Sequence, residues 1–296
     1  MTDTPRRLSA SIEATSLPAG LYLVATPIGA ARDITLRALD VLNSADVLAA
    51  EDTRVLRHLM DIHGVPLRGR RVLAYHDHNG DRARPALLAA LADGASVAYC
   101  SDAGTPLVAD PGYRLARDAA EAGARVHALP GPSAALTALS LSGLPSDRFL
   151  FLGFPPATAA ARKTWLRQWM AVDSTLIIFE SPRRINRTLK ELCEIDANRI
   201  TVVARELTKK FEEIIRGRAA DLADDPRMDS LKGEIVMVLD RPTPVTAGDD
   251  DIRAVLLRHL EHLSVKDAAR EAATELGLPR RDVYQFALTM GRDDGE

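Results

Sequence analysis

One loop of the chain has the residues expected of a ligand-binding turn: Ser101-Asp102-Ala103-Gly104-Thr105-Pro106, followed by Asp110-Pro111-Gly112. It holds more turn-forming residues than a plain connection between a strand and a helix needs. Gly104 permits a positive φ or a close approach of the backbone to a ligand, and Pro106 stiffens the end of the loop. Such a loop can present backbone N–H and C=O groups to a flat, polar ligand. Gly131-Pro132-Ser133-Ala134 follows the next expected strand in a similar way, so the two loops predict a lined cleft.

Thr26-Pro27-Ile28-Gly29 stands where a dinucleotide-binding protein has its glycine-rich G-x-G-x-x-G turn. A single glycine and a proline do not make that fingerprint, so a pyrophosphate cradle at a helix N-terminus is not supported. By itself, the segment is equally consistent with an ordinary turn between a strand and a helix.

Tyr75-His76-Asp77-His78-Asn79 contains residue types that bind metals. Because side chains alternate along an extended chain, His76 and His78 can face the same way. No further clustered histidine or cysteine completes a zinc-like set, and we predict no metal site. Contact with substrate or hydrogen bonding within the loop is the favoured interpretation. The two cysteines, Cys100 and Cys193, lie apart in or beside apolar runs, which excludes a disulfide framework.

Positively charged residues follow two expected strands in the second half of the chain, in Glu180-Ser181-Pro182-Arg183-Arg184-Ile185 and Arg205-Glu206-Leu207-Thr208-Lys209-Lys210. Clusters of this kind can bind the phosphates of a nucleic acid, although solvated helix faces explain each cluster equally well. Lys and Arg total 38 against 41 Asp and Glu, which excludes a protein that wraps nucleic acid through bulk charge. The residues predicted to contact RNA are Arg54, Arg183, Arg184, Arg205 and Lys210.

Alternating strands and helices are expected to position these loops. The strands are predicted at Leu21–Ala25, Val47–Ala50, Val72–Tyr75, Ser96–Cys100 and Arg125–Leu129, and the helices at Ile34–Asn43, Thr53–Asp61, within Asp81–Ala92 and from about Asp110 to Ala122. This order predicts an α/β domain with a largely parallel sheet. Ligands of such sheets bind beyond the carboxyl ends of the strands, so four polar loops should converge on one edge.

The second half predicts a mixed α/β domain followed by a helical tail. Its strands are expected at Phe149–Leu152, Thr175–Phe179, Ile200–Ala204, around Phe211–Ile215 and at Glu234–Leu239. The tail is predicted to contain a helix at Ile252–His262, one from the capping box of Ser264 and Asp267 to Gly277, and one at Arg280–Met290. The last two resemble a helix-turn-helix. Residues 246–296, which include the tail, hold 7 basic against 11 acidic residues, so a packing or dimerisation role is at least as well supported as nucleic-acid binding.

The length of 296 residues favours about two domains. We predict a flexible segment at 1–18, domains at 19–145 and 146–241, a linker that starts at Pro242, and the tail at 249–291. No apolar run approaches the ~20 residues of a membrane-spanning helix, and the first residues lack the apolar stretch of a signal peptide. The sequence therefore predicts a cytoplasmic protein with no membrane partner.

As an ordered set, the motifs of the chain closely resemble the ribosomal RNA small subunit methyltransferase I family. The match runs from about Leu21 to Leu239, and the helical tail is also similar to that family. The matching segments are Leu23–Gly29, Asp33–Leu39, Glu51–Arg54, Ser101–Pro106, Asp110–Tyr113, Pro130–Ala134, Gly153-Phe154, Glu180–Pro182 and Arg205–Lys209. Ala30-Ala31 departs from the pattern, since the family usually has Asn-Leu there.

The resemblance implies the fold of the tetrapyrrole methylase superfamily (class III methyltransferases): two α/β domains, commonly in a homodimer, with S-adenosylmethionine in the cleft between them. It also implies 2′-O-methylation of a cytidine ribose in the decoding region of 16S rRNA, within the small ribosomal subunit. The residues that it places around the methyl donor are Pro27, Ile28, Gly29, Ser101, Asp102, Ala103, Gly104, Thr105, Pro106, Ser133, Ala134, Glu180, Ser181, Leu207 and Thr208, with Gly233-Glu234 as a further wall segment.

The implied reaction needs placement more than covalent chemistry, because a sulfonium methyl is already activated. A carboxylate or lysine can assist removal of the hydroxyl proton, and Asp52, Glu206 and Lys209 are the predicted catalytic residues, with Glu51 a further candidate by position. An ion pair between Glu206 and Lys209 that supports the loop is the alternative. Two other functions stay open: methylation of a precorrin-type tetrapyrrole ring, and RNA binding without catalysis.

Overall fold

The computed structural model describes residues 11–109, 111–242, 249–276 and 278–293. They belong to two compact units, one ending at Pro242 and the other beginning at Thr243. Asp110 of the predicted loop, most of the predicted linker, the helix end at Gly277 and the first ten residues of the predicted flexible segment lie outside the described residues.

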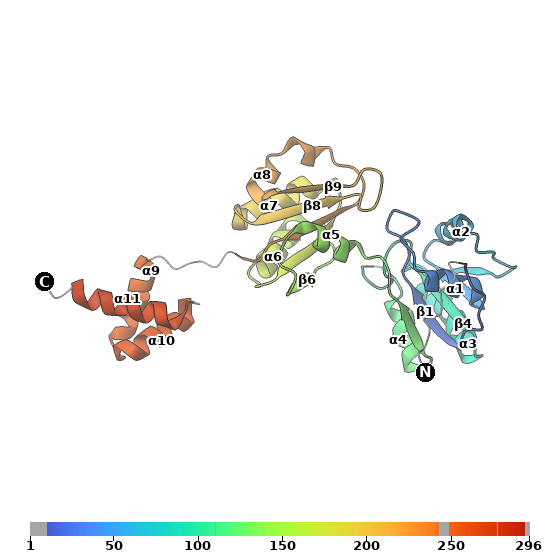
Figure 1. The fold of residues 1–296 in the computed structure, drawn as a ribbon, viewed down its shortest axis with the longest axis horizontal. Helices are drawn as coiled ribbons and strands as arrows, with labels where there is room; N and C mark the ends of the chain where they lie inside the picture. The colour runs from blue at the N-terminus through green and yellow to red at the C-terminus, as the bar shows by residue number, and fades with distance from the viewer. Residues whose placement is uncertain (1–10, 110, 243–248, 277, 294–296) are drawn as a thin grey trace, which may run out of the picture. The chain divides into compact units, whose positions relative to one another are not determined.

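The first sheet has five parallel strands in the order β3-β2-β4-β1-β5 (Figure 1). Its strands are β1 (Gly20–Val24), β2 (Val47–Ala50), β3 (Val72–Ala74), β4 (Ser96–Cys100) and β5 (Val126–Leu129), and the intervening helices are α1 (Leu36–Ser44), α2 (Thr53–Ile62), α3 (Gly80–Ala92) and α4 (Tyr113–Glu121). The predicted parallel α/β sheet is confirmed, and β2 and β4 have the predicted bounds. Strand order places the carboxyl ends of β1, β2 and β4 side by side, where the polar loops begin.

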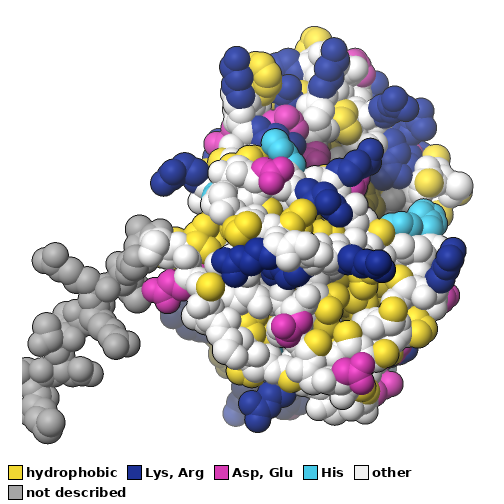
Figure 2. All heavy atoms as spheres, turned by 90° about the vertical axis from the view of Figure 1, so that its right-hand side faces the viewer, with side chains coloured by type: hydrophobic (Ala, Val, Ile, Leu, Met, Phe, Trp, Pro, Cys, Tyr) yellow, Lys and Arg dark blue, Asp and Glu magenta, His cyan; other side chains and the backbone are white. Residues whose placement is uncertain are grey.

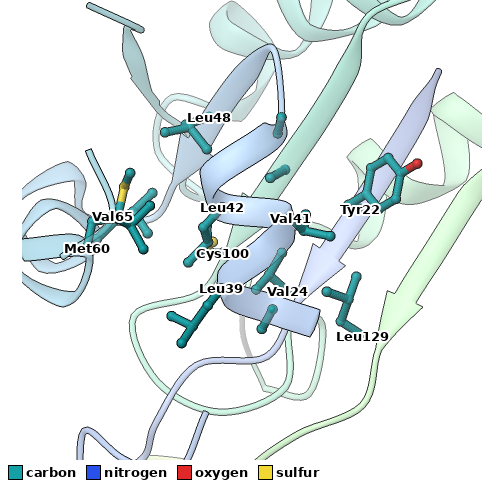
Figure 3. Close-up of a cluster of buried hydrophobic side chains, with 14 of the residues drawn as sticks. Tyr22, Val24, Leu39, Val41, Leu42, Leu48, Met60, Val65, Cys100 and Leu129 are labelled. Carbon is teal, nitrogen blue, oxygen red and sulfur yellow. The ribbon is translucent and has the colours of Figure 1, made fainter. Parts of the chain in front are cut away.

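Helix α1 packs against this sheet through an apolar core (Figure 3). Leu39 and Leu42 of α1 contribute to the core from the helix side, and Val24, Leu48 and Cys100 contribute from three neighbouring strands. The helix begins where the Thr35 side chain accepts a hydrogen bond from the Ala38 N–H at 3.1 Å, a cap that satisfies one of the free N–H groups of the first turn. The core thereby fixes the strand ends that carry the loops.

Residues 11–18 form no helix or strand but lie against α1. The Glu13 N–H donates to Asp40 Oδ1 at 2.7 Å, and the Thr15 N–H donates to Ser44 Oγ at 3.0 Å. Ile12 and Leu17 pack on the core beneath. This part of the predicted flexible segment therefore has defined contacts with the first sheet's helices.

The second sheet is mixed, which confirms the predicted mixed α/β character, and its strand order is β6-β7-β10-β8-β9. Its strands are β6 (Phe149–Phe151), β7 (Thr175–Glu180), β8 (Ile200–Arg205), β9 (Glu213–Arg218) and β10 (Ile235–Leu239). Only β6 and β7 pair in parallel, and the other pairs are antiparallel. The helices of this region are α5 (Ala134–Ser142), α6 (Ala159–Met170), α7 (Ile185–Asp196) and α8 (Ala219–Ala223), with a 3₁₀ turn, η1, at Pro226–Asp229.

Helix α5 follows β5 of the first sheet in the chain but packs on the second sheet. Ala138 and Leu139 lie in one core with Ile177 and Val238 of β7 and β10. The helix is apolar on most sides, so its sequence has no amphipathic pattern that indicates which sheet it covers. Helix α5 therefore packs with the second sheet, although it lies before residue 145, where the sequence predicted the boundary between the two domains.

The second unit contains three helices in its described residues: α9 (Asp249–Leu260), α10 (Val265–Leu276) and α11 (Arg280–Asp293). Leu256, Ala272 and Val283, one from each helix, share a buried core. Ser264 Oγ accepts from the Asp267 N–H at 3.2 Å, which confirms the predicted cap of α10. In the described parts of both units, no helix combines the length and the apolar character needed to cross a membrane.

Candidate functional site

The loop after β4 is attached to the end of β1 by a two-residue bridge. Thr26 and Gly104 exchange both backbone hydrogen bonds at 2.9 Å, and the Thr26 hydroxyl donates to the Ser101 carbonyl at 3.1 Å. Gly104 has a φ of +81°, which favours glycine. The bridge uses the N–H and C=O of Gly104 itself, so the role of Gly104 is to shape the loop. The sequence suggested that the backbone of this loop could bind a ligand, but these two groups are not free to do so.

A cavity of about 340 Å³ lies beside this loop and is also lined by the second sheet; we name it the inter-sheet pocket. The lining residues are Ile28, Ala103, Gly104, Thr105, Val108, Ala109, Ser133, Ala134, Phe154, Phe179, Glu180, Ser181, Pro182, Gly233, Glu234, Ile235 and Val236. The wall is thus formed by the loop after β4, the start of α5 and the adjacent ends of β7 and β10. Apolar side chains and glycines predominate, as is usual for a small-molecule site.

The structure brings eight of the predicted donor-binding residues to the inter-sheet pocket: Ile28, Ala103, Gly104, Thr105, Ser133, Ala134, Glu180 and Ser181. Seven others do not line it: Pro27, Gly29, Ser101, Asp102, Pro106, Leu207 and Thr208. Ser101 is buried and its hydroxyl donates to the Gly104 carbonyl at 3.2 Å, so it supports the loop from below. Thr105 is held against the segment that precedes α5, because its hydroxyl donates to the Pro132 carbonyl at 2.9 Å.

Gly29 and Thr208 join the two sheets beside the pocket. The Ala30 N–H donates to Thr208 Oγ1 at 3.0 Å, and a Cβ on Gly29 would lie 2.5 Å from the same oxygen. Thr208 has a φ of +62°, an uncommon conformation for a residue with a branched side chain. The contact is made by the backbone of Ala30, which explains why the Ala30-Ala31 departure leaves this junction intact.

Glu180 is buried at the end of β7 and organises the start of α7. Its carboxylate accepts hydrogen bonds from the Ser181 N–H at 2.7 Å and the Thr188 hydroxyl at 2.7 Å, and it pairs with Arg184 at 2.7 Å. Arg184 also donates to the Pro155 carbonyl, and only 23% of its side chain is exposed. The contact with RNA that the sequence predicted for Arg184 is therefore not favoured, because an internal ion pair uses its guanidinium.

Glu51 and Asp52 are linked to the loop after β4. The Asp52 N–H donates to Asp102 Oδ1 at 2.8 Å, and the Asp102 N–H donates in return to the Glu51 carboxylate. Burial raises the pKa of the Glu51 carboxyl, and the negative charge of Asp102 acts in the same direction. Hydrogen bonds from Arg54 lower the pKa of Asp52 to about 2. Of these two carboxylates, Glu51 is thus the stronger proton acceptor.

Glu206, Lys209 and Glu234 form an ion-pair cluster at the edge of the second sheet. Lys209 Nζ lies 2.9 Å from Glu206 Oε1 and 3.0 Å from Glu234 Oε2, and the Glu234 N–H donates to Glu206 Oε1 at 2.9 Å. The bond from Glu234 and the Lys209 ammonium lower the pKa of Glu206. Burial acts to lower the pKa of Lys209, but its two glutamate partners raise it overall. The supporting ion pair that the sequence left open is present, and both shifts disfavour the predicted base role.

The other residues predicted to contact RNA differ in availability. Arg205 donates to the Lys232 carbonyl at 2.7 Å and pairs with Glu213 at 3.3 Å, so it supports the loop. Arg54 is highly exposed although it pairs with Asp52. Lys210 lies over the Phe211 ring, 5.5 Å from its centroid. Arg183 is exposed and forms no ion pair with any residue in the described ranges.

A larger set of exposed basic residues lies in a region where the sequence predicted only Arg54 to contact RNA. Between residues 32 and 71, six arginines are exposed against three aspartates: Arg32, Arg37, Arg54, Arg57, Arg68 and Arg71 against Asp33, Asp46 and Asp61. Figure 2 views the molecule from the side of the first sheet and shows Lys and Arg side chains gathered over the upper half of this face. The arginines are spaced irregularly along the chain, so no sequence pattern groups them, and only their exposure in the structure shows that they are available together.

The loop from His76 to Asn79 is held by its own hydrogen bonds. The Asn79 amide oxygen accepts from the His76 N–H at 2.8 Å, and its nitrogen donates to the Ala74 carbonyl at 3.0 Å. The rings of His76 and His78 lie 6.1 Å apart. Hydrogen bonding within the loop, one of the two favoured interpretations, is confirmed.

Comparison with known proteins adds the following findings. Residues 20–223 match the family model described as tetrapyrrole (corrin/porphyrin) methylases, and residues 246–291 match the RsmI C-terminal HTH domain. The chain is 47% identical over 287 residues to the ribosomal RNA small subunit methyltransferase I of Mesorhizobium japonicum, covering 96% of this chain and 97% of that one. The protein of the same name from Escherichia coli O157:H7 is 42% identical, covering 90% and 94%.

Among solved structures, the fold is similar to that of uroporphyrin-III C-methyltransferase from Thermus thermophilus complexed with S-adenosyl homocysteine. The TM-score is 0.52 at 21% sequence identity, covering 75% of this chain and 97% of that one. Together with the family models, this similarity confirms the predicted fold class, an α/β tetrapyrrole methylase fold followed by a small helical appendage.

Proposed function

The chain belongs to the ribosomal RNA small subunit methyltransferase I family of tetrapyrrole methylases, and from this we propose that it transfers a methyl group from S-adenosylmethionine to the 2′-oxygen of a cytidine ribose in the decoding region of 16S rRNA. The observation that carries the proposal is the inter-sheet pocket, which collects the loop after β4, the start of α5 and the ends of β7 and β10.

The residues of the inter-sheet pocket fit S-adenosylmethionine in size and polarity. Its volume of about 340 Å³ suits a small molecule, and apolar residues such as Ile28 and Val236 would contact the adenosine part. Ser133 and Ala134 stand at the N-terminus of α5, whose partial positive charge would favour the donor's carboxylate. The bound donor supplies an activated methyl group on a positively charged sulfur.

Proton removal from the ribose hydroxyl is the step in which this chain's side chains would take part. Glu51 is the candidate that we favour, because its pKa is raised and it is hydrogen-bonded to the backbone of the loop that lines the pocket. A base with a pKa closer to neutral is the more effective catalyst, since it combines ionisation with affinity for the proton. Asp52, Glu206 and Lys209 would then hold the loops that surround the reaction.

An RNA acceptor is supported by the exposed arginines between residues 32 and 71. Phosphate contacts of such side chains position a nucleic acid without reading its sequence. They lie in the same half of the chain as Glu51 and the loop after β4, so RNA held there would approach the pocket from the first sheet. The homodimer implied by the family resemblance, and the identity of the target nucleotide, stay predictions.

Methyl transfer to small ribosomal subunits tests the proposed function. The protein is incubated with labelled S-adenosylmethionine and subunits from cells that lack the corresponding enzyme, and the rRNA is digested with alkali. We expect the label in an alkali-resistant dinucleotide, because a methylated 2′-oxygen blocks hydrolysis. Label in a base, or in an added porphyrinoid substrate in place of rRNA, would contradict the proposal. Donor binding without label in any acceptor would favour the non-catalytic alternative.

A further inference from the structure

The loop after β4 also lines a second cavity, of about 360 Å³. Thr105, Val108 and Ala109 line the inter-sheet pocket, whereas Pro111–Arg114 line this second one. The opposite wall comes from the loop after β3 and the start of α3, with His76, Asp77, Asp81 and Arg84. We name it the α3–α4 pocket. One loop therefore borders both cavities.

The floor of the α3–α4 pocket is held in place by contacts with two tyrosines. The Tyr99 hydroxyl donates to the Pro111 carbonyl at 2.9 Å, and the Tyr99 and Tyr75 rings meet edge to face at 5.6 Å. Gly112 has a φ of +117°, and a Cβ there would lie 2.5 Å from the Tyr99 ring. The chain must therefore carry glycine at this position for the loop to rest on Tyr99.

The polar groups of the pocket are suited to a ligand with both donors and acceptors. Arg84 pairs through Nε with Asp118 at 2.8 Å and through Nη2 with Asp81 at 3.0 Å. Its third nitrogen, Nη1, is buried, and a hydrogen bond between the Arg84 side chain and Tyr75 raises the pKa of Arg84. Asp77 is exposed and offers carboxylate oxygens to a ligand amino group.

Tyr113 adds an aromatic surface at the mouth of the α3–α4 pocket. Its residue surface is 65% exposed, and the Arg117 guanidinium lies over the ring, 5.9 Å from the centroid. A large exposed ring held in place by a guanidinium is a platform on which a nucleobase can stack. An apolar partner alone would not explain the charged groups deeper in the cavity.

We propose that the α3–α4 pocket binds the base of the nucleotide that flanks the methylated nucleotide in the RNA strand. Tyr113 stacks on this base, Asp77 and Arg84 contact its polar edge, and Arg114 contacts the adjoining phosphate. Neighbouring nucleotides of one strand lie close together, which suits two cavities bordered by a single loop. This assignment rests on the proposed function. Asp77, which lines this pocket, also raises the pKa of the Glu51 carboxyl, so this pocket and the favoured base are near one another.

Substitution of Tyr113 tests the stacking contact in the full-length protein. With small ribosomal subunits as substrate, Tyr113→Ala is expected to raise KM for the subunit about 10-fold, while Tyr113→Phe keeps the stacking ring and stays near wild type. The Kd for S-adenosylmethionine, measured by calorimetry, should be unchanged in both. An unchanged KM in Tyr113→Ala would overturn the proposal, as would an equal loss in both variants.

Arg82 serves as the control for the phosphate contact of Arg114, which also pairs with Asp81 at 3.4 Å. Both are exposed arginines near the α3–α4 pocket, but only Arg114 lines it. We expect Arg114→Ala to raise KM and Arg82→Ala to have little effect, whereas equal effects would indicate bulk charge and count against a specific site.

Photo-crosslinking separates this inference from the proposed function. With p-benzoylphenylalanine in place of Tyr113, the crosslink on rRNA is expected immediately beside the methylated nucleotide. A crosslink elsewhere, or none, overturns the inference even if methyl transfer is intact. If the wild-type protein transfers no methyl group, the proposed function fails, and the crosslink still decides whether the pocket holds RNA.

Discussion

Glu51 and Glu206 follow strands β2 and β8, one in each sheet, and their carboxylates meet opposite surroundings. Glu206 accepts a hydrogen bond from the Glu234 N–H and pairs with Lys209 at 2.9 Å, which lowers its pKa. Glu51 forms no ion pair with any residue that the structure describes; burial and the neighbouring Asp102 raise its pKa. Two glutamates that each follow a strand thus have pKa values shifted in opposite directions.

This difference in pKa indicates which of the two sheets has a carboxylate suited to act as a general base. A carboxylate whose oxygens are taken up by a lysine and a backbone N–H stabilises a loop but has little remaining affinity for a proton. A half-buried carboxylate without a cation accepts a proton more readily. If Glu51 is the base, as we propose, the strand ends of the first sheet supply the reactive carboxylate and those of the second sheet support the inter-sheet pocket.

The largest expected effect is that of Glu51→Gln on methyl transfer. Loss of a general base lowers kcat by about 100-fold or more, while the Kd for S-adenosylmethionine should stay unchanged. The same change should slightly stabilise the fold at neutral pH. Because the folded-state pKa is raised above its ordinary value of 4.5, ionised Glu51 opposes folding, and stability falls as pH rises from 4.5 through the folded pKa. Single-turnover rates and thermal unfolding measure the two effects.

Asp52→Asn is the matched control for Glu51→Gln. Asp52 is the adjacent carboxylate, but its low pKa makes it a weak base, so a loss of kcat comparable to that of Glu51→Gln would remove the distinction between them. Wild-type kcat in Glu51→Gln would exclude Glu51 as the base and leave catalysis to donor placement alone.

The next effect is the loss of donor binding in Gly104→Val. A β-branched residue is strained at the φ of +81°, and the loop would relax away from its bridge with Thr26. Strain of this kind lowers the affinity for S-adenosylmethionine by about 10- to 100-fold in calorimetry, with the fold retained. Gly123→Ala is the control, since Gly123 has the same φ but lies in open space at the end of α4. Equal donor affinity in Gly104→Val and wild type would contradict the assignment of the loop.

The order of strands and helices in the first sheet could be predicted because its signals are local. Ser96–Cys100 is a short, largely apolar run, and the helices before and after it end at Gly94 and Gly123, which both have a positive φ. The convergence of polar loops then follows from the parallel order of the strands. Six pocket residues could be identified from family motifs in those same loops, and Glu180 and Ser181 from a motif at the end of β7.

The surroundings of individual side chains could not be predicted, because they depend on how the folded elements pack and not on a local sequence pattern. Arg183 and Arg184 are adjacent and identical in type, yet one is exposed and the other pairs with buried Glu180. Leu207 and Thr208 match a motif of the donor site. They lie in a turn with positive φ angles, and the Leu207 carbonyl and the Thr208 hydroxyl lie against Gly29 instead of lining the pocket. The raised pKa of Glu51 likewise arises from burial and from the charge of Asp102, which is distant in the sequence.

A smaller effect is expected for Gly29→Ala, which tests the supporting side. The new Cβ would lie 2.6 Å from Lys209 Cγ and 2.8 Å from the Leu207 carbonyl, so the junction between the sheets must shift. Overpacking of this kind lowers the free energy of unfolding by about 1 to 3 kcal/mol in urea titrations. At Gly80 a Cβ would meet only ordinary contacts of 3.6 Å, so Gly80→Ala should not be destabilising. Equal stability of Gly29→Ala and wild type would show that the junction is not closely packed.

The smallest effect is expected for Glu206→Gln, which removes the carboxylate that pairs with Lys209. Because the folded-state pKa of Glu206 lies below its ordinary value of 4.5, its stabilising contribution is present above pH 4.5 and is lost as pH falls through the folded pKa. Glu206→Gln should therefore be modestly less stable than wild type at pH 7, and the difference should shrink in acid. Unfolding midpoints measured between neutral pH and pH 3 follow this convergence, and kcat should stay close to wild type. A loss of kcat as large as that of Glu51→Gln, at unchanged donor affinity, would instead place the reactive carboxylate on the second sheet and reverse the comparison.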